Sequence, residues 1–258
     1  WKAQRRAFMR MYGAEVYASP SDHTKTGREL LKESPKHPGS LGIAVSEGLE
    51  DARGDDHAIY CLGSVLNHVL LHQTVIGLET KAQFERFGEY PDVMVSCLGG
   101  GSNFGGFTLP FFADAIHGKD IRFLAAQSQV APNLQGEYRY DFADHAEITP
   151  LLKMYTLGHH AEMQPIRGDG LRYHGAAPIL SFLRHLGDLG TVAYPADEKH
   201  VFERARMFVQ TEGFLPAPES AYSVACAMDE ALKCKESGEP KVIAFTLSGH
   251  GSQDRAGS

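Results

Sequence analysis

The chain has 258 residues, with 25 Lys and Arg against 32 Asp and Glu, which gives a formal net charge of −7. Its hydrophobic fraction of 43% is enough to build a core, so a disordered chain is excluded. The acidic balance argues against nucleic acid or an anionic membrane surface as the main partner. Apolar runs stay well below the ~18 residues that a membrane-spanning helix needs.

The first ninety residues predict mostly helices. Residues 5–12 predict a helix that Gly13 closes, and residues 14–17 predict a short strand. Further helices are expected at 26–31, at 41–52 with a solvated acidic face over 47–56, and at 62–87 with an interruption near Gly77. The chain begins with Trp1 in the middle of a helical pattern, so we expect it to be the C-terminal part of a longer protein.

The remaining residues alternate between strand and helix patterns. Buried parallel strands are expected at 92–98, 121–126 and 241–247, and helices at 108–116 and 151–155. Residues 127–175 otherwise predict long connections. Strand–helix alternation with glycines at the carboxyl ends of strands is typical of a layered α/β fold with a mainly parallel sheet.

The glycine loop, Gly99-Gly100-Gly101-Ser102-Asn103, follows the first of these strands directly. Glycines bring backbone N–H groups close to a ligand, and a following helix presents its positive N-terminal end. Ser102 and Asn103 add side-chain donors. The pattern matches neither a Walker A loop nor a dinucleotide fingerprint, but its place at a strand's carboxyl end predicts a site for a phosphate dianion.

The four cysteines form no CxxC pair, and their spacing fits no zinc module. They are Cys61, Cys97, Cys226 and Cys234. We expect free thiols in a reducing, cytoplasmic setting. A nucleophilic cysteine is disfavoured because no neighbouring residue would activate it.

Several blocks in one order resemble a known family. They are GSVLNHVLLHQTVIG (63–77), GEYPD (88–92), GGGSNF (99–104), GEYRYDF (136–142), LLKMYTLGH (151–159), GLRYHG (170–175), EGFLPAPESA (212–221) and LSGHG (247–251). Together they resemble the tryptophan synthase β-chain-like family, and more narrowly its stand-alone second type of β chain. The resemblance covers nearly the whole chain.

The resemblance implies a fold-type II pyridoxal-phosphate enzyme that makes L-tryptophan from L-serine and indole by β-replacement. It implies that the glycine loop, Gly99, Gly100, Gly101, Ser102 and Asn103, holds the cofactor phosphate. It implies that Ser248 hydrogen-bonds the pyridine nitrogen, and that Glu219 and Ser220 line the cofactor ring. It further implies a homodimer that works without an α subunit, and it allows a monovalent cation near the glycine loop.

The family's Schiff-base lysine has no counterpart here. It lies upstream of every matched block, as do the segment that binds the substrate carboxylate and the glutamate for indole attack. Lys153 lies in a matched block but is not that lysine. The 258 residues are therefore expected to lack activity alone. Two alternatives remain open: another fold-type II enzyme of the threonine or cysteine synthase kind, and a non-catalytic protein that binds pyridoxal phosphate or a phosphoester.

The histidines predict little on their own. His68 and His72 have metal-binding spacing, but HExxH fails, and packed or capping roles on an interface helix are favoured. The pair at 159–160 and His174 either line a substrate channel or lie partly exposed in loops. His250 either titrates near the cofactor or packs in its loop. The alternating charges of residues 137, 139 and 141 predict a solvated strand or turn.

Overall fold

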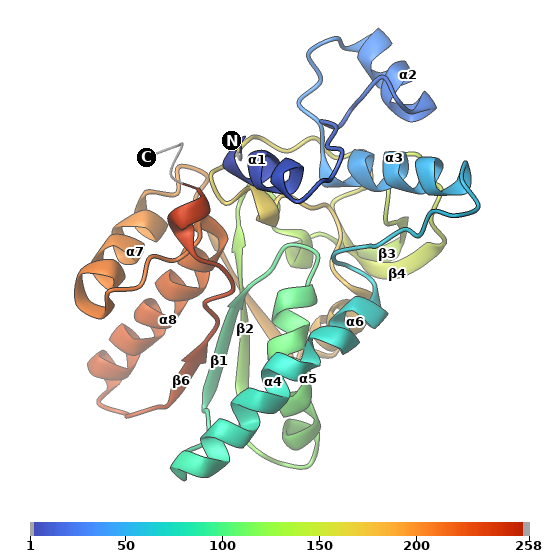
Figure 1. The fold of residues 1–258 in the computed structure, drawn as a ribbon. Coiled ribbons are helices and arrows are strands. Elements are labelled where there is room, and N and C mark those ends of the chain that lie inside the picture. The colour runs from blue at the N-terminus through green and yellow to red at the C-terminus, as the bar shows by residue number, and fades with distance from the viewer. Residues whose placement is uncertain (1–2, 255–258) are drawn as a thin grey trace.

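The computed structural model describes residues 3–254. A four-stranded parallel sheet forms its centre, in the order β5-β2-β1-β6. The strands are β1 (Val93–Cys97), β2 (Arg122–Ser128), β5 (Leu189–Tyr194) and β6 (Ile243–Phe245). The expected α/β fold with a mainly parallel sheet is therefore confirmed (Figure 1).

Helices cover both faces of this sheet (Figure 1). One face carries α4 (Asn67–Phe87), α5 (Ser102–Ile116) and α6 (Pro178–Leu186), and the other carries α7 (Lys199–Glu212) and α8 (Pro218–Ser237). Two apolar clusters correspond to the two faces, one with Leu70, Phe104 and Leu180, the other with Val201 and Ala221. Each strand is thus buried from both sides, which explains its continuous apolar run.

Helix α4 runs without a break through Gly77, so the expected interruption there is wrong. A Cβ added to Gly77 would lie 2.5 Å from the carbonyl oxygen of Phe107, so this glycine lets α4 and α5 approach closely. The helix begins at Asn67 rather than near residue 62, after Val65 in the left-handed region (φ +66). Val75 and Ile76 on this helix are half exposed.

A small second sheet replaces the helix expected at 151–155. β3 (Glu137–Phe142) and β4 (Leu151–Thr156) form an antiparallel hairpin. Met154 is fully buried, and the β4 backbone is hydrogen-bonded to α6 by a bond from Tyr155 N to Ser181 Oγ of 2.9 Å. The apolar run was short enough to fit either element, and pairing with β3 decided for the strand.

The N-terminal segment forms α1 (Ala3–Met11), α2 (Lys25–Glu33) and α3 (Leu41–Arg53). Residues 14–17 form no strand, because they lie largely exposed without a partner strand. Arg5 in α1 forms an ion pair of 2.8 Å with Asp254 near the other end of the described chain. Short 3₁₀ helices complete the fold: η1 (Asn133–Gln135), η2 (Asp169–Leu171) and η3 (Gly251–Gln253).

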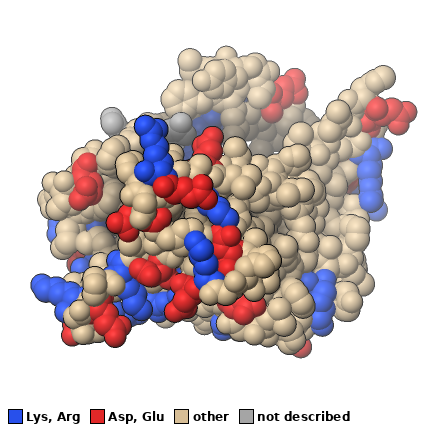
Figure 2. All heavy atoms as spheres, turned by 90° about the horizontal axis from the view of Figure 1, so that it is seen from below, with Lys and Arg blue, Asp and Glu red and all other residues tan. Residues whose placement is uncertain are grey.

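The acidic face expected over 47–56 is not uniformly solvated. Glu47 is buried, and its carboxylate accepts hydrogen bonds from Ser19 Oγ, from Thr24 Oγ1 and from the N–H and hydroxyl of Ser21. This carboxylate ties the chain before α2 to α3. None of the helices within residues 3–254 has the length and apolar character needed to cross a membrane. Acidic and basic side chains are interspersed on the face in Figure 2.

Candidate active site

Three segments meet at the carboxyl edge of the main sheet: the glycine loop after β1, residues 246–249 after β6, and the start of α8. Ser248 Oγ lies 2.8 Å from Ser220 Oγ, and Gly249 N donates to the same Ser220 hydroxyl over 3.0 Å. Ala217 N donates to Gly249 O over 2.8 Å. The two chain segments that carry the expected ring contacts are therefore joined by direct hydrogen bonds.

The glycine loop turns directly into a helix. Gly101 is the N-cap of α5 and has φ +112, a backbone conformation that residues with a Cβ rarely adopt. The helix α5 therefore starts at Ser102, rather than at residue 108 as expected. No side chain caps this end, so the first-turn amides lack an intrahelical or capping partner. Free amides and the positive end of the helix dipole together suit an anion.

The glycines themselves are explained by packing against other loops. An added Cβ would lie 2.5 Å from Gly170 O at Gly99, 2.5 Å from Ser64 Oγ at Gly100, and 2.7 Å from Leu180 Cδ1 at Gly101. Their Cβ directions thus point at protein atoms rather than into open space. The missing side chains let three neighbouring segments enclose the turn, while its amides remain the groups that can meet a ligand.

The side chain of Asn103 faces the sheet. Its Nδ2 donates to Ser96 Oγ over 2.6 Å and lies 3.4 Å from Thr246 Oγ1, so it links β1 to the segment after β6. Ser102 Oγ lies 3.4 Å from Gly63 O. Asn103 therefore fixes the loop, and its contribution to an anion site would come from its backbone rather than from the expected side-chain donor.

Glu219 lies in the first turn of α8, after two prolines fix the approaching chain. Its Oε1 accepts a hydrogen bond of 2.8 Å from Gly170 N. Gly170 in turn lines a cavity of about 310 Å³ together with Gly39, Ser40 and Arg172. The cavity thus opens beside the loop that contacts both Glu219 and Gly99, and it is a candidate substrate space.

Asn133 is a residue that the sequence reasoning missed. Its buried side-chain Nδ2 lies 2.8 Å from Gly99 O and 3.0 Å from each of Tyr173 O and Gly175 O. These carbonyls come from the glycine loop and from the segment after η2. An asparagine between a proline and a leucine carries no local signal of such a role, because its three acceptors are distant in sequence.

All four cysteines are free, as expected. Burial raises the pKa of the Cys97 thiol, and it raises the pKa of Cys226 to about 11. Cys97 Sγ lies 3.8 Å from Ser248 Oγ, close to the hydroxyl pair. Both buried thiols are protonated at neutral pH, which fits a packing role rather than a nucleophilic one.

The histidines differ in their surroundings. His174 is buried, not partly exposed, and burial lowers its pKa while its Nε2 hydrogen-bonds Phe142 O over 2.9 Å. His68 and His72 lie exposed on α4 of the single chain, and their packing on an interface helix stays a prediction. His250 is exposed, and its Nδ1 caps η3 by accepting from Ser252 N, which is a role within its loop.

Comparisons with known proteins identify the family of this chain. The model of a family described as pyridoxal-phosphate dependent enzyme matches residues 2–249. The chain is 54% identical to "Tryptophan synthase beta chain 2" of Aquifex aeolicus (strain VF5), over 98% of this chain and 59% of that protein. It is 54% identical to "Tryptophan synthase beta chain" of Thermococcus onnurineus (strain NA1), over 99% of this chain and 58% of that protein. The chain thus spans less than two thirds of these relatives' length.

Two solved structures share the fold. A threonine deaminase from T.th. has a TM-score of 0.60 and 20% identity, over 95% of this chain and 66% of that one. Maize serine racemase has a TM-score of 0.57 and 18% identity, over 96% of this chain and 63% of that one. At these identities the likeness concerns the fold alone.

Proposed function

The chain belongs to the family of pyridoxal-phosphate-dependent enzymes, and from this premise we propose that the intact protein is a tryptophan synthase β-type lyase. The proposed reaction replaces the hydroxyl of L-serine by indole and yields L-tryptophan. The observation that carries the proposal is the 54% identity to tryptophan synthase beta chains along nearly the whole chain. The alternatives, a threonine or cysteine synthase-like enzyme and a non-catalytic binder, have no comparable support.

The site residues fit the cofactor's two polar ends. The turn at Gly99–Gly101 and the uncapped start of α5 suit a phosphate dianion through backbone amides. Asn103 holds this turn against β1 by its bond to Ser96. The phosphate would therefore be held without a basic side chain, by a backbone that neighbouring loops keep in place.

The hydroxyl of Ser248 suits the ring nitrogen. Ser220 fixes it through the contact of 2.8 Å, and Gly249 N fixes Ser220 in turn. When bound, pyridoxal phosphate supplies the electron sink for the bond changes at serine. A hydroxyl does not hold a proton on the ring nitrogen as a carboxylate would, so Ser248 would moderate that sink and favour replacement at Cβ over transamination. Glu219, held by Gly170 N, would lie beside the ring.

We also propose a cytoplasmic homodimer that needs no α subunit. Two adjacent helices, α4 and α6, support a dimer because both expose apolar side chains. Ile179 N of α6 donates a hydrogen bond of 3.2 Å to Asn67 Oδ1 of α4, which places the two helices side by side. The exposed apolar side chains are Leu71, Val75, Leu78, Phe182 and Leu186. The free cysteines support a reducing compartment. Light scattering of the purified intact protein tests the dimer, since a monomer would refute it.

The activity test uses the intact protein, purified with its cofactor. Given L-serine and indole without any α subunit, it should form L-tryptophan, detected by chromatography. Ser248→Ala should be strongly impaired, while Ser237→Ala, at the exposed end of α8, should match the wild type. A protein that consumes serine but never incorporates indole would refute the proposed reaction.

We further propose that residues 1–258 by themselves hold pyridoxal phosphate without a covalent bond. The reason is that none of the lysines occupies the family's Schiff-base position; Lys153 instead lies in β4 with its ammonium 3.3 Å from Tyr138 O. Borohydride treatment followed by mass spectrometry should leave the chain's mass unchanged. A single labelled lysine would overturn this proposal.

A further inference from the structure

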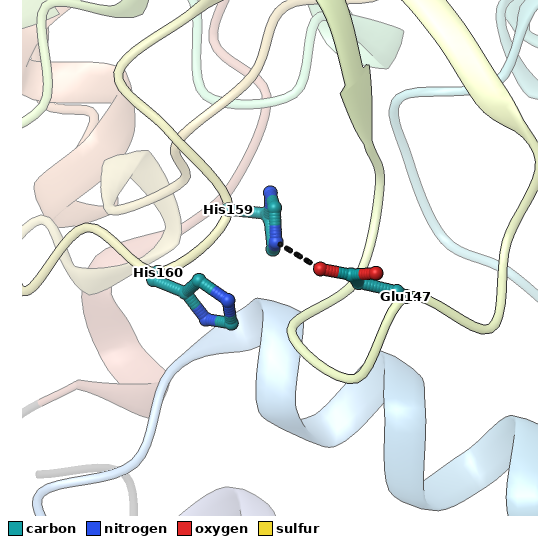
Figure 3. Close-up of side chains that lie close together, drawn as sticks. All are labelled: Glu147, His159 and His160. Carbon is teal, nitrogen blue, oxygen red and sulfur yellow. Dashed lines mark hydrogen bonds and ion pairs between the residues drawn. The ribbon is translucent and has the colours of Figure 1, made fainter.

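A cluster of ligating side chains lies outside the site described above. Glu147 belongs to the turn between β3 and β4, and His159 and His160 belong to the loop after β4 (Figure 3). One ligand atom from each of the three lies within 4.8 Å of the others. His159 Nε2 is 3.2 Å from Glu147 Oε1. The three side chains thus converge on one small volume from two loops.

A buried carboxylate orients His159. Asp141 Oδ1 lies 2.5 Å from His159 Nδ1, and the Asp141 carboxyl also accepts from Thr156 Oγ1 over 2.6 Å and from Phe142 N over 3.0 Å. Asp141 is only 1% exposed, which also corrects its expected solvated position. A carboxylate behind one ring nitrogen presents the other nitrogen as a ligand, the arrangement found behind metal-binding histidines.

This orientation creates an unbalanced contact. A neutral imidazole has a single N–H, whereas carboxylates face both ring nitrogens of His159. In the tautomer that donates from Nδ1 to Asp141, the lone pair of Nε2 faces the Glu147 carboxylate at 3.2 Å, and a metal ion can bridge these two acceptors. The nearby second imidazole, His160, offers a further ligand for it.

The turn that carries Glu147 is held in place before any ion binds. Asp144 is buried and accepts from Ile148 N over 3.1 Å and from Thr149 N over 2.8 Å, and Ser46 Oγ donates to it over 2.7 Å. Glu147 itself has φ +58, an unfavourable backbone conformation for a residue with a side chain. The fixed turn therefore keeps the Glu147 carboxylate directed at His159.

His145 supports His160 from outside the cluster. Its Nδ1 lies 3.4 Å from His160 Nδ1, and its backbone N–H is anchored on Gly42 O over 3.1 Å. His145 is not among the side chains whose ligand atoms all lie within 4.8 Å of one another, so it positions His160 rather than binding the ion. His145 and His160 also line a cavity of about 330 Å³, which gives an ion access from solvent.

We propose that Glu147, His159 and His160 form a binding site for a divalent transition-metal cation, best matched by zinc. Two imidazoles with one carboxylate suit zinc and its neighbours rather than calcium or magnesium, which take oxygen ligands. A bound ion joins the β3–β4 turn to the loop after β4. Because only the folded chain brings these groups together, the metal stabilises the folded state.

The test uses the intact protein with its cofactor, stripped of metal by a chelator and titrated with Zn²⁺. We expect one zinc per chain by elemental analysis and a rise in unfolding temperature. Glu147→Gln and His160→Ala should each weaken zinc affinity by at least ~10-fold. Both residues are exposed, so these variants should fold, which circular dichroism checks. His57→Ala, an exposed histidine in the loop after α3, is the matched control and should bind zinc like the wild type.

Cobalt gives an independent readout. Co²⁺ bound to the wild type, with water as the fourth ligand, should show the intense visible absorption of four-coordinate cobalt, and His160→Ala should weaken it. Zinc binding without unit stoichiometry, or equal affinity in Glu147→Gln, His160→Ala and the control, would overturn the proposal. A protein that binds no zinc would equally overturn it.

Discussion

The side-chain nitrogen of Asn133 lies 2.8 Å from the carbonyl oxygen of Gly99, and it has two further carbonyl oxygens, of Tyr173 and Gly175, at 3.0 Å. An amide has only two N–H groups for three acceptors. Converging carbonyls are the ligands that an alkali cation accepts in proteins. The side-chain nitrogen of Asn133 thus lies next to the glycine loop, at a position where an alkali cation could otherwise coordinate the same three oxygens.

Asn133→Ala should leave three buried carbonyls without this partner. We expect the free energy of unfolding to fall by roughly 1–3 kcal/mol, measured by urea denaturation. Potassium should restore part of the loss in the variant and have little effect on the wild type. Gln135→Ala, an exposed neighbour, is the control. A variant as stable as the wild type, or insensitive to potassium while the wild type responds, would contradict the inference.

Ser248→Ala in the intact protein should lower kcat by about tenfold or more, because one hydrogen bond to the ring would be lost. Affinity for the cofactor should change less, since we propose that the glycine loop, and not Ser248, binds the phosphate. Ser220→Ala should show a weaker effect in the same direction, because it only positions Ser248. Steady-state kinetics and cofactor titration measure both; equal rates and spectra in Ser248→Ala would count against its role.

Gly101→Ala should destabilise the fold for two separable reasons. The left-handed backbone costs roughly 1–2 kcal/mol for a residue with a Cβ. The new methyl would also lie 2.7 Å from Leu180 Cδ1. Leu180→Ala removes the clashing Cδ1 atom. Introducing Gly101→Ala into the Leu180→Ala variant should therefore cost less stability than introducing it into the wild type. The loss that remains should be the backbone cost alone. Thermal unfolding of the four proteins checks this; purely additive losses would contradict it.

Glu47→Gln should destabilise the protein in a pH-dependent way. Burial by itself raises the pKa of Glu47, but the hydrogen bonds from Ser19, Thr24 and Ser21 outweigh it and hold the pKa below its ordinary value. Because the pKa is lower in the folded state, the ionised carboxylate stabilises the protein at pH values above the unfolded-state pKa of about 4.3. This stabilisation is lost as the pH falls through the folded-state pKa.

The deficit of Glu47→Gln should therefore be full at pH 7, at roughly 1–3 kcal/mol, and should shrink below about pH 4. Urea unfolding across this range measures it. Glu79→Gln, at an exposed position of α4, should match the wild type throughout. A deficit that stays constant with pH would show that the charge of Glu47 contributes nothing.

Local patterns were enough for β1, β2 and the glycine loop. The runs at 92–98 and 121–126 became β1 and β2 because strands buried on both faces need continuous apolar residues. Three consecutive glycines before Ser102 predicted a tight turn, and Gly101 adopts a positive φ of +112 in it. The matched blocks of family sequence also placed Ser220 and Ser248 in one site, and they lie in hydrogen-bond contact.

Long-range pairing decided the rest. Residues 151–155 became a strand only because β3 was available beside them, and Glu47 became buried only because Ser19, Ser21 and Thr24 fold over it. The three acceptors of Asn133 and the convergence of Glu147 with His159 likewise join segments that the sequence keeps apart. Periodicity and composition report which side chains are apolar or charged, whereas the partners of a buried polar group depend on chain segments that meet only in the folded protein.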